Sequence, residues 1–210
     1  WKPRCMNFAS RCRNGNSPSI GTGASLTMPT IMRGATSPAA LAMARITPVI
    51  HGCRRVIDVG CGPATQLAQV ADLNPEISFL GVDLSEEMLT QAKEHIRALG
   101  LKNVEFLQSN MTDMAAIGTD QADGVISTMA LHHLPSDTQL DQCFSEIRRI
   151  LRPQGALYLT DFGRLKSLLS VIYFAYMNAA HQPHIFSLDY ERSLRAAFLP
   201  EDFSRLLAEY

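Results

Sequence analysis

Several features that define other protein classes are missing from this 210-residue sequence. No apolar run reaches the roughly 20 residues that a transmembrane helix needs, and the longest, residues 168–177, predicts a buried helix. Charged residues make up only 19% of the chain and hydrophobic residues 46%, which is too apolar for an intrinsically disordered protein. The composition therefore predicts one globular domain without a membrane span.

The cysteines exclude two kinds of site. There are five of them, an odd number with irregular spacing, and no Cys-x-x-Cys pair occurs. A zinc site or a disulfide framework needs regular pairs, so neither is expected. Reduced cysteines and the lack of an apolar signal segment predict a cytoplasmic location.

Acidic residues are missing from the start of the chain, because the first one is Asp58. Eight of the 19 basic residues stand before it, although the net charge of the whole chain is only −1. The sequence after Asp58 is therefore acidic. Residues 1–50 are predicted to form a basic N-terminal segment, for which three interpretations stay open: a transit peptide, a flap over an anionic ligand, or a loosely ordered leader.

Short apolar segments alternate with helical patterns from residue 55 onward. We predict strands at residues 55–59, 77–82, 104–107, 124–127 and 156–160. We predict helices at residues 38–50, 64–73, 85–100, 137–151, 165–180, 189–197 and 200–210, and irregular structure at residues 1–27. This alternation predicts an α/β fold, a Rossmann-like, doubly wound, mostly parallel sheet with helices on both faces. The expected organisation is a core at residues 51–164, followed by a helical segment at residues 165–210.

A glycine turn follows the first predicted strand of this alternation, as Asp58-x-Gly60-x-Gly62. Glycines there let the backbone approach a ligand, and the next helix offers free N–H groups. Asp83 ends the following strand, where a carboxylate can accept both hydroxyls of a ribose. Alone, the turn could be structural and Asp83 a helix cap. Together, at this spacing, they favour a nucleoside site.

Four motifs in order carry a family resemblance: residues 58–62 (DVGCG), 81–89 (GVDLSEEML), 131–134 (LHHL) and 147–155 (IRRILRPQG). Together they resemble the class I methyltransferases, and most of all the small-molecule group related to ubiquinone-biosynthesis methyltransferases. The resemblance covers about residues 54–162. It implies that the chain binds S-adenosylmethionine, transfers its methyl group by direct displacement, and leaves S-adenosylhomocysteine.

The resemblance also implies roles for individual residues. The cofactor residues would be Asp58, Gly60, Cys61, Gly62, Asp83, Leu84, Met88, Asn110, Met111, Ser127 and Thr128. In this assignment Asp58 meets the methionine ammonium, the glycine turn lines the methionine and ribose, and Asp83 holds the ribose hydroxyls. Residues 84 and 88 lie against the adenine or ribose, residues 110 and 111 lie at the adenine edge, and residues 127 and 128 run past the sulfonium.

The sequence departs from the family pattern in two places. The usual third glycine of the turn is Ala64, which is still small. The family sheet normally ends with an antiparallel hairpin, but no convincing strand follows residue 160. We therefore expect the C-terminal hairpin to be missing or truncated.

Proton-accepting side chains are needed only if the methyl acceptor must lose a proton. The residues predicted to be catalytic are His133, Asp161, Tyr176 and His181, and the neighbouring candidates are His132, Tyr173 and His184. Each of them could equally be a packing residue. The histidines at 181 and 184 lack the helical zinc-binding spacing, so no metal is expected.

The acceptor itself has no motif of its own. The apolar, aromatic segment at residues 168–190 favours a small, partly apolar molecule, placed between the last two strand tips and residues 165–190, with the N-terminal segment as a partial lid. Nucleic acid is disfavoured, because the acidic core has no basic stripe. A homodimer is left open. Two alternatives remain. One is a catalytically silent, methyltransferase-like binding protein. The other is a nicotinamide-dependent oxidoreductase, whose Gly-x-Gly-x-x-Gly motif needs a third glycine at the position where this chain has Thr65.

Overall fold

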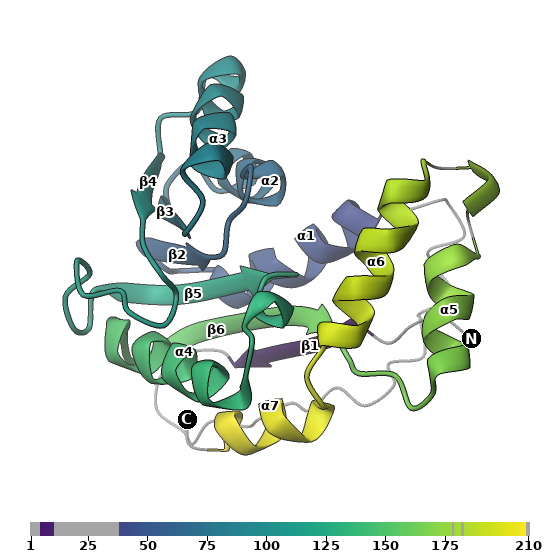
Figure 1. The fold of residues 1–210 in the computed structure, drawn as a ribbon. Coiled ribbons are helices and arrows are strands. Elements are labelled where there is room, and N and C mark those ends of the chain that lie inside the picture. The colour runs from purple at the N-terminus through teal and green to yellow at the C-terminus, as the bar shows by residue number, and fades with distance from the viewer. Residues whose placement is uncertain (1–4, 11–37, 178, 182, 209–210) are drawn as a thin grey trace, which may run out of the picture.

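A six-stranded sheet forms the centre of the computed structural model, which describes residues 5–10, 38–177, 179–181 and 183–208 (Figure 1). The strand order is β1-β6-β5-β2-β3-β4. The strands are β1 (Cys5–Ser10), β2 (Arg55–Val59), β3 (Ser78–Asp83), β4 (Val104–Gln108), β5 (Ala122–Thr128) and β6 (Leu151–Phe162). Strands β2 to β6 are parallel to one another, and β1 alone runs antiparallel, beside β6.

The strand order reverses at β2. This strand pairs with β3 on one side and with β5 on the other, so the chain proceeds outward from β2 in both directions. In an open parallel sheet, ligands bind beyond the carboxyl ends of the strands at such a point. The fold therefore places the candidate site at the ends of β2, β3 and β5.

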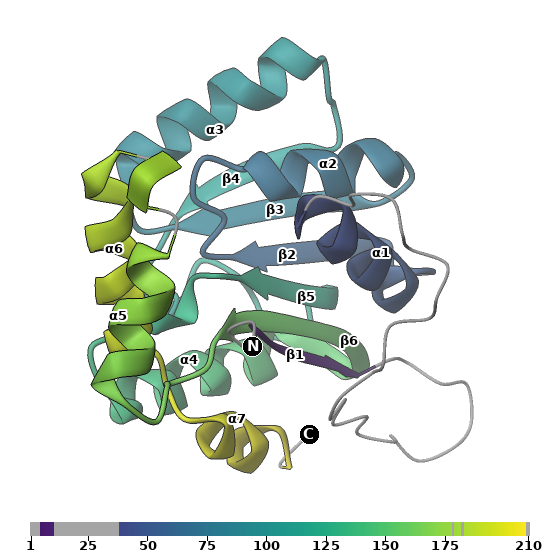
Figure 2. The same cartoon turned by 90° about the vertical axis from the view of Figure 1, so that its right-hand side faces the viewer.

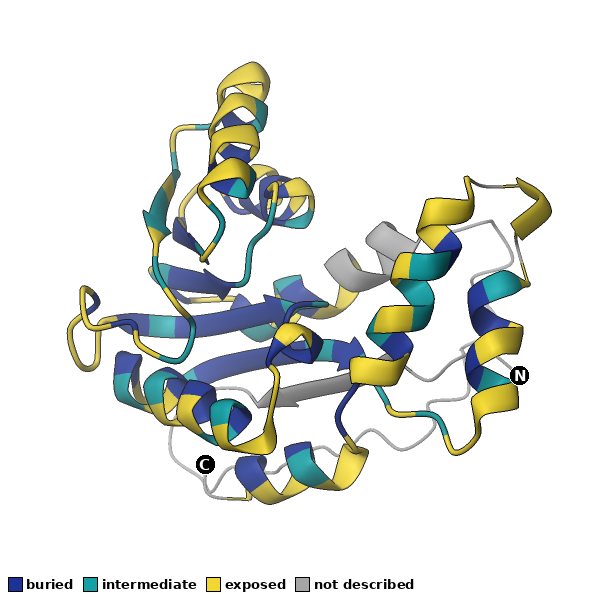
Figure 3. Cartoon of the chain, in the orientation of Figure 1, coloured by how far each residue is buried: buried dark blue, intermediate teal, exposed yellow. Residues whose placement is uncertain are grey.

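Helices cover both faces of the sheet (Figure 2). Helices α1 (Pro38–Ile50), α2 (Thr65–Leu73) and α3 (Glu86–Leu99) pack on one face, where Val56 and Phe79 point. Helices α4 (Asp137–Ile150) and α7 (Pro200–Leu207) pack on the other, where Ile57 and Leu80 point. Neighbouring strand residues face opposite sides, so both layers bury apolar side chains, and the central strands β2, β3 and β5 are mostly buried (Figure 3).

The remaining helices follow β6. They are α5 (Leu168–Tyr176), the short η2 (Ala179–His181) and α6 (His184–Ala196), and they lie beyond the carboxyl ends of the strands (Figures 1 and 2). A further short turn, η1 (Leu131–His133), follows β5. These elements surround the edge of the sheet where the candidate site lies.

Local capping agrees with the sequence. The Ser85 side chain accepts a hydrogen bond from the Met88 backbone at the start of α3, and Gly100 ends that helix with a φ of 71°. Such a left-handed backbone suits glycine. The predicted α/β, mostly parallel fold with helices on both faces is confirmed.

Three predicted elements are wrong. Residues 5–10 were expected to be irregular, but they form β1, an edge strand whose pairing depends on backbone groups rather than on a composition pattern. The helix predicted at residues 165–180 ends at Tyr176, and α6 begins at His184, five residues before the helix predicted at 189–197. Pro183 stands at the start of α6 with a φ of −57°, which is where proline's fixed backbone fits.

The antiparallel edge of the sheet therefore comes from the N-terminus. Within residues 163–177, 179–181 and 183–208 no strand follows β6. Instead β1 occupies the antiparallel position beside β6, from Cys5 opposite Phe162 to Ser10 opposite Leu157. The predicted lid falls largely on residues 11–37, which lie outside the described residues.

Candidate active site

The glycine turn connects β2 to α2 and is held by its neighbouring strand. The N–H groups of Gly60 and Cys61 both donate to the carbonyl oxygen of Val82, at 2.8 and 3.0 Å. A Cβ atom on Gly60 would lie 2.3 Å from the Cβ of Ala130, so packing forbids any side chain there. A Cβ atom on Gly62 would meet nothing within 4 Å. The turn therefore packs tightly on the β5 side and leaves open space at Gly62.

Asp83 at the end of β3 is fixed beside this turn. Its Oδ2 accepts from the Gly62 N–H at 2.8 Å, and its Oδ1 accepts from the Ser85 N–H at 2.9 Å. Each carboxylate oxygen has a second lone pair, and the residue is only half-buried. Asp83 can therefore fill both predicted roles. It caps the start of α3, and its remaining lone pairs can still accept hydrogen bonds from the two hydroxyls of a ribose.

Asp58 near the end of β2 is the most unusual polar group in the site. It is 2% exposed, and its Oδ1 has no hydrogen-bond partner among the described residues. Burial, and secondly the charge of Asp83, raise the pKa of this carboxyl to about 7. An unpaired buried carboxylate is unfavourable unless a cation or a donor reaches it. The site therefore has a built-in place for a cationic ligand group.

Cys61 lies within electrostatic range of both carboxylates, which disfavour its thiolate form. Burial, followed by the charges of Asp58 and Asp83, raises the pKa of its thiol well above the ordinary value. The thiolate is the reactive form of cysteine, so this side chain stays a thiol. Its Sγ donates to the Gly62 carbonyl oxygen at 3.6 Å, and its role is to pack within the turn.

The residues predicted to hold the adenosine lie around the start of α3 and the end of β4. Leu84 is 64% exposed and Met88 is half-buried in the first turn of α3. Asn110 is exposed beyond β4, where its Oδ1 accepts from the Thr112 N–H at 3.0 Å. An adenine ring needs an apolar surface and a polar partner for its edge, which an exposed leucine and an exposed amide can supply.

Different surroundings are found for Met111, which is predicted to lie at the adenine edge, and for Ser127 and Thr128, which are predicted to pass the sulfonium. The Cε of Met111 would lie 3.4 Å from a Cβ on Gly60, so this side chain adjoins the glycine turn. Ser127 is buried, and its hydroxyl donates to the Val59 carbonyl oxygen at 2.7 Å, which ties β5 to β2. Thr128, at the end of β5, is partly exposed. Ser127 therefore braces the sheet, while Thr128 and Met111 lie at its edge.

Asp161 near the end of β6 forms a buried pair with His132. The Nδ1 of His132 lies 2.7 Å from Asp161 Oδ1, and the His132 backbone N–H donates to Oδ2 at 3.1 Å. The Phe162 N–H also donates to Oδ1, at 2.7 Å. His133 and Asp161 are each predicted to be catalytic, whereas the structure pairs Asp161 with the preceding histidine, His132. Nothing in the doubled histidine indicates which of the two turns inward.

His133 lies on the outer side of η1. Its side chain is exposed, and its ring centroid lies 4.2 Å from that of His132. Partial burial, and then the charge of His132, lower the pKa of His133. Nearby Asp83 and Asp161 act in the opposite direction, which places His133 within electrostatic range of the glycine-turn site.

Tyr176 and His181 lie further from the strand tips, on the segment after β6. The Tyr176 hydroxyl donates to Glu191 Oε2 at 2.9 Å and so joins α5 to α6; this hydrogen bond raises the pKa of Tyr176. His181 is exposed in η2. Among the residues that the structure describes, no cluster of three or more His, Cys, Asp or Glu side chains could hold a metal.

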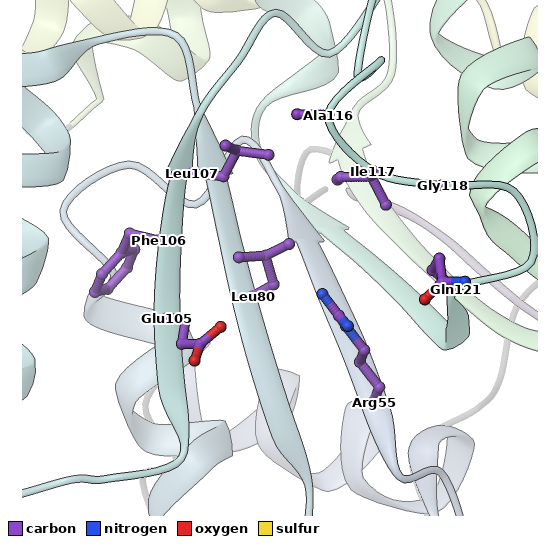
Figure 4. Close-up of a pocket in the computed structure, with 9 residues that line it drawn as sticks. All are labelled: Arg55, Leu80, Glu105, Phe106, Leu107, Ala116, Ile117, Gly118 and Gln121. Carbon is purple, nitrogen blue, oxygen red and sulfur yellow. The ribbon is translucent and has the colours of Figure 1, made fainter.

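A separate cavity of about 410 Å³ lies on the face of the sheet (Figure 4). Its lining includes Arg55, Leu80, Glu105, Leu107, Ile117 and Gln121. It exists because residues 109–121, which join β4 to β5, form no helix over this part of the sheet. None of the glycine-turn residues lines it, so it is not part of the site at the strand ends. No helix in the described part of the chain is long and apolar enough to cross a membrane.

The fold and the site define an α/β protein with a glycine turn after β2 and an acidic residue at the end of β3. The chain belongs to the methyltransferase domain family, whose family model matches residues 50–194. The resemblance to class I methyltransferases is thereby confirmed.

Curated relatives carry methyltransferase names. A ubiquinone biosynthesis O-methyltransferase of Xanthomonas oryzae is 30% identical over 113 residues, which cover 52% of this chain and 44% of that protein. A U6 snRNA (guanine-N(2))-methyltransferase of Mus musculus is 30% identical over 128 residues, which cover 60% of this chain and 24% of that protein. The chain spans less than half the length of these curated relatives.

Solved structures share the fold. A methyltransferase of Methanosarcina mazei superimposes with a TM-score of 0.60 and 20% identity, covering 78% of this chain and 82% of that one. A methyltransferase of Aquifex aeolicus has a TM-score of 0.55 and 20% identity, covering 74% and 70%. The [4+2]-cyclase SpnF has a TM-score of 0.58 and 20% identity, covering 74% and 72%. At these identities the likeness concerns the fold alone.

Proposed function

We propose that this chain transfers the methyl group of S-adenosylmethionine to a small, partly apolar molecule and releases S-adenosylhomocysteine. The observation that carries the proposal is the unpaired oxygen of buried Asp58, beside the open space at Gly62 and the fixed carboxylate of Asp83. These three features match three parts of the cofactor. Asp58 suits the cationic amine, the open space at Gly62 suits the chain that joins the amine to the ribose, and Asp83 suits the ribose diol. Membership of the methyltransferase family supports it.

The residues of the chain would bind and orient the cofactor. Asp58 pairs with the methionine ammonium, since a charged hydrogen bond is the strongest way to satisfy a buried carboxylate. Asp83 accepts from the ribose hydroxyls. Leu84 and Asn110 contact the adenine. When bound, S-adenosylmethionine supplies a sulfonium-activated methyl group, and the protein contributes alignment and the exclusion of water.

The acceptor would lie beside the tips of β5 and β6, under the helical segment of residues 165–190. An apolar cluster lies there, built on Val171, Phe174, Ala175 and Leu194 with Phe162 and Tyr190 packed against it. Such a lining favours a small molecule with an apolar body. The acidic excess after residue 57 opposes binding to the nucleic acid backbone, although one relative acts on an RNA.

Asp83→Ala tests the cofactor assignment. We expect S-adenosylmethionine to bind about 10- to 100-fold more weakly, because a hydrogen bond to a charged group contributes roughly 1.5–3 kcal/mol. The measurement is isothermal titration with S-adenosylmethionine, and in parallel with NAD. Asp72→Ala is the matched control, since Asp72 is an exposed carboxylate on α2. Equal affinity in the two folded variants, or tighter binding of NAD by the parent protein, would overturn the assignment.

A catalytically silent, methyltransferase-like binding protein is the alternative. Formation of S-adenosylhomocysteine in the presence of an acceptor distinguishes turnover from binding alone. The cytoplasmic location, the homodimer and the N-terminal lid stay predictions.

A further inference from the structure

Two charged side chains near the end of α4, Glu146 and Arg149, form an ion pair that reaches out of the helix. Arg149 belongs to the motif at residues 147–155. Its Nε donates to Glu146 Oε1 and its Nη2 donates to Glu146 Oε2, both at 2.7 Å, which is a two-point contact. The hydrogen bond from Arg149 holds the pKa of Glu146 below its ordinary value. The pair is therefore an ionised, well-oriented unit at neutral pH.

This pair holds the segment that joins β4 to β5. Glu146 Oε2 accepts from the Met114 backbone N–H at 2.7 Å. The Arg149 guanidinium donates to the carbonyl oxygens of Ile117, at 2.7 Å, and of Met114, at 3.0 Å. Residues 109–121 form no helix, so their backbone groups need partners from elsewhere in the fold. The pair supplies these partners, close to where Ile117 lines the cavity of Figure 4.

The beginning of the same segment adjoins the proposed cofactor site. The Ser109 N–H donates to the carbonyl oxygen of Asp83 at 3.0 Å. The Cε of Met111 would lie 3.4 Å from a Cβ on Gly60. Asn110 lies between these two contacts, and its own side chain closes a tight turn. This turn is therefore anchored by β3 on one side and by the α4 pair on the other.

We propose that the Glu146–Arg149 pair positions the turn that receives the adenine ring of the methyl donor. The inference rests on the proposed function, in which Asn110 and Met111 lie at the adenine edge. The pair acts through the turn and does not contact the cofactor, so both are positioning residues. A turn that is already ordered binds more tightly, because no free energy is spent on ordering it when the cofactor arrives.

Isothermal titration of the full chain with S-adenosylmethionine tests the coupling in four proteins: the parent, Arg149→Met, Asn110→Ala and the double variant. We expect each single variant to bind about 10-fold more weakly, the effect of one lost hydrogen bond. If both residues act on the same turn, the double variant should bind no more than about 20-fold more weakly. Independent effects would instead multiply to about 100-fold. A pair that only stabilised α4 would give this multiplied loss.

The matched control is Arg205→Met. Arg205 donates to Asp141 Oδ1 at 2.6 Å, so this variant removes another arginine ion pair of α4 without reaching the segment after β4. Its affinity should stay within about 2-fold of the parent value, because exposed ion pairs contribute little. If Arg149→Met does not fold, Arg149→Lys replaces it, since an ammonium keeps the charge but lacks the planar fork of donors.

Amide hydrogen exchange gives a second measurement that needs no ligand. The Met114 amide should exchange slowly in the parent protein and in Arg205→Met. In the Arg149 variant it should exchange at least about 10-fold faster, because its acceptor Glu146 is no longer held in place.

The possible results bear on different claims. Parent-like affinity in either single variant, a multiplied loss in the double variant, an equal loss in Arg205→Met or an unchanged Met114 exchange rate would each overturn the positioning role. Failure of the parent protein to bind S-adenosylmethionine would instead overturn the proposed function. The Met114 exchange rates would then still decide whether the pair holds the segment.

Discussion

The carboxyl ends of the strands form one side of the sheet, and the two halves of this side are built from different parts of the chain. The half proposed to bind the cofactor, at the ends of β2 and β3, depends on backbone geometry: Gly60 and Gly62 have φ values of 78° and 52°, and backbone N–H groups fix the Asp83 carboxylate. The half proposed to bind the acceptor, at the ends of β5 and β6 with α5 and α6, depends mainly on contacts between side chains. It depends on the Asp161–His132 pair and on apolar contacts.

The exposure of the two halves differs as well. On α5 and α6, Leu169 is 80% exposed and Phe186 is 60% exposed, and no Asp, Glu, Lys or Arg occurs between residues 166 and 189. In the cofactor half the carboxylate of Asp58, near the end of β2, is buried. A turn fixed by backbone hydrogen bonds suits a constant cofactor, whereas exposed side chains on α5 and α6 can be varied without disturbing the sheet.

Gly60→Val is expected to have the largest effect, because Gly60 is where the halves meet. Its Cβ would lie 2.3 Å from Ala130 Cβ, and its φ of 78° disfavours a β-branched residue. Strain and overpacking together should lower the free energy of unfolding by about 4 kcal/mol. Cofactor binding should be lost. Thermal and urea unfolding measure the first effect, and isothermal titration the second.

The matched change in the acceptor half is Leu169→Ser. Because that side chain is 80% exposed, the free energy of unfolding should change by no more than about 0.5 kcal/mol. Similar decreases in the free energy of unfolding for Gly60→Val and Leu169→Ser would remove the contrast between the two halves.

The next largest expected effect is a pH dependence of the free energy of unfolding, which comes from the raised pKa of Asp58. An aspartate in the unfolded chain loses its proton near pH 4, whereas Asp58 in the folded chain keeps it up to about pH 7. The native state thus binds more protons between these values. The stabilisation is fully present below about pH 4 and is lost as the pH rises through 7, at up to about 1.4 kcal/mol per pH unit.

Urea unfolding of the cofactor-free protein at several pH values measures this slope, and Asp58→Asn should lack it. S-adenosylmethionine should show the opposite trend, binding more tightly as the pH rises toward 7, since only the ionised carboxylate pairs with an ammonium. Parallel pH profiles for the parent protein and Asp58→Asn would mean that Asp58 is already satisfied in the folded chain.

The smallest expected effect concerns Ala64, at the end of the glycine turn. Its φ of 57° is left-handed, which costs an L-residue about 1–2 kcal/mol. Ala64→Gly removes that strain but adds the backbone entropy of glycine, so a net stabilisation of about 0.5 kcal/mol is expected in thermal unfolding. Ala68→Gly, in the regular part of α2, should instead destabilise by about 1 kcal/mol. A decrease in the free energy of unfolding for both variants would show that the Ala64 methyl group stabilises the fold by packing more than its backbone strain destabilises it.

Local features of the cofactor half could be predicted from the sequence. The strand at residues 55–59, the turn of Gly60 and Gly62, the position of Asp83 and the helix that Ser85 caps are all where the pattern indicated. Each depends on residues within a few positions of one another, and backbone preferences and capping act over that range.

Only the tertiary structure decided the features that join distant segments. Cys5–Ser10 pairs with Leu157–Phe162 through backbone groups that any sequence possesses, so no pattern announced the strand. Asp161 reaches His132 across 29 residues, and the choice between two adjacent histidines depends on which one the turn η1 directs inward. The raised pKa of Asp58 likewise arises from burial by the assembled sheet and helices. The sequence by itself determined where a nucleoside could bind, because that turn is local; the folded chain decided which side chains stand beside it, because burial and pairing across the sheet exist only after folding.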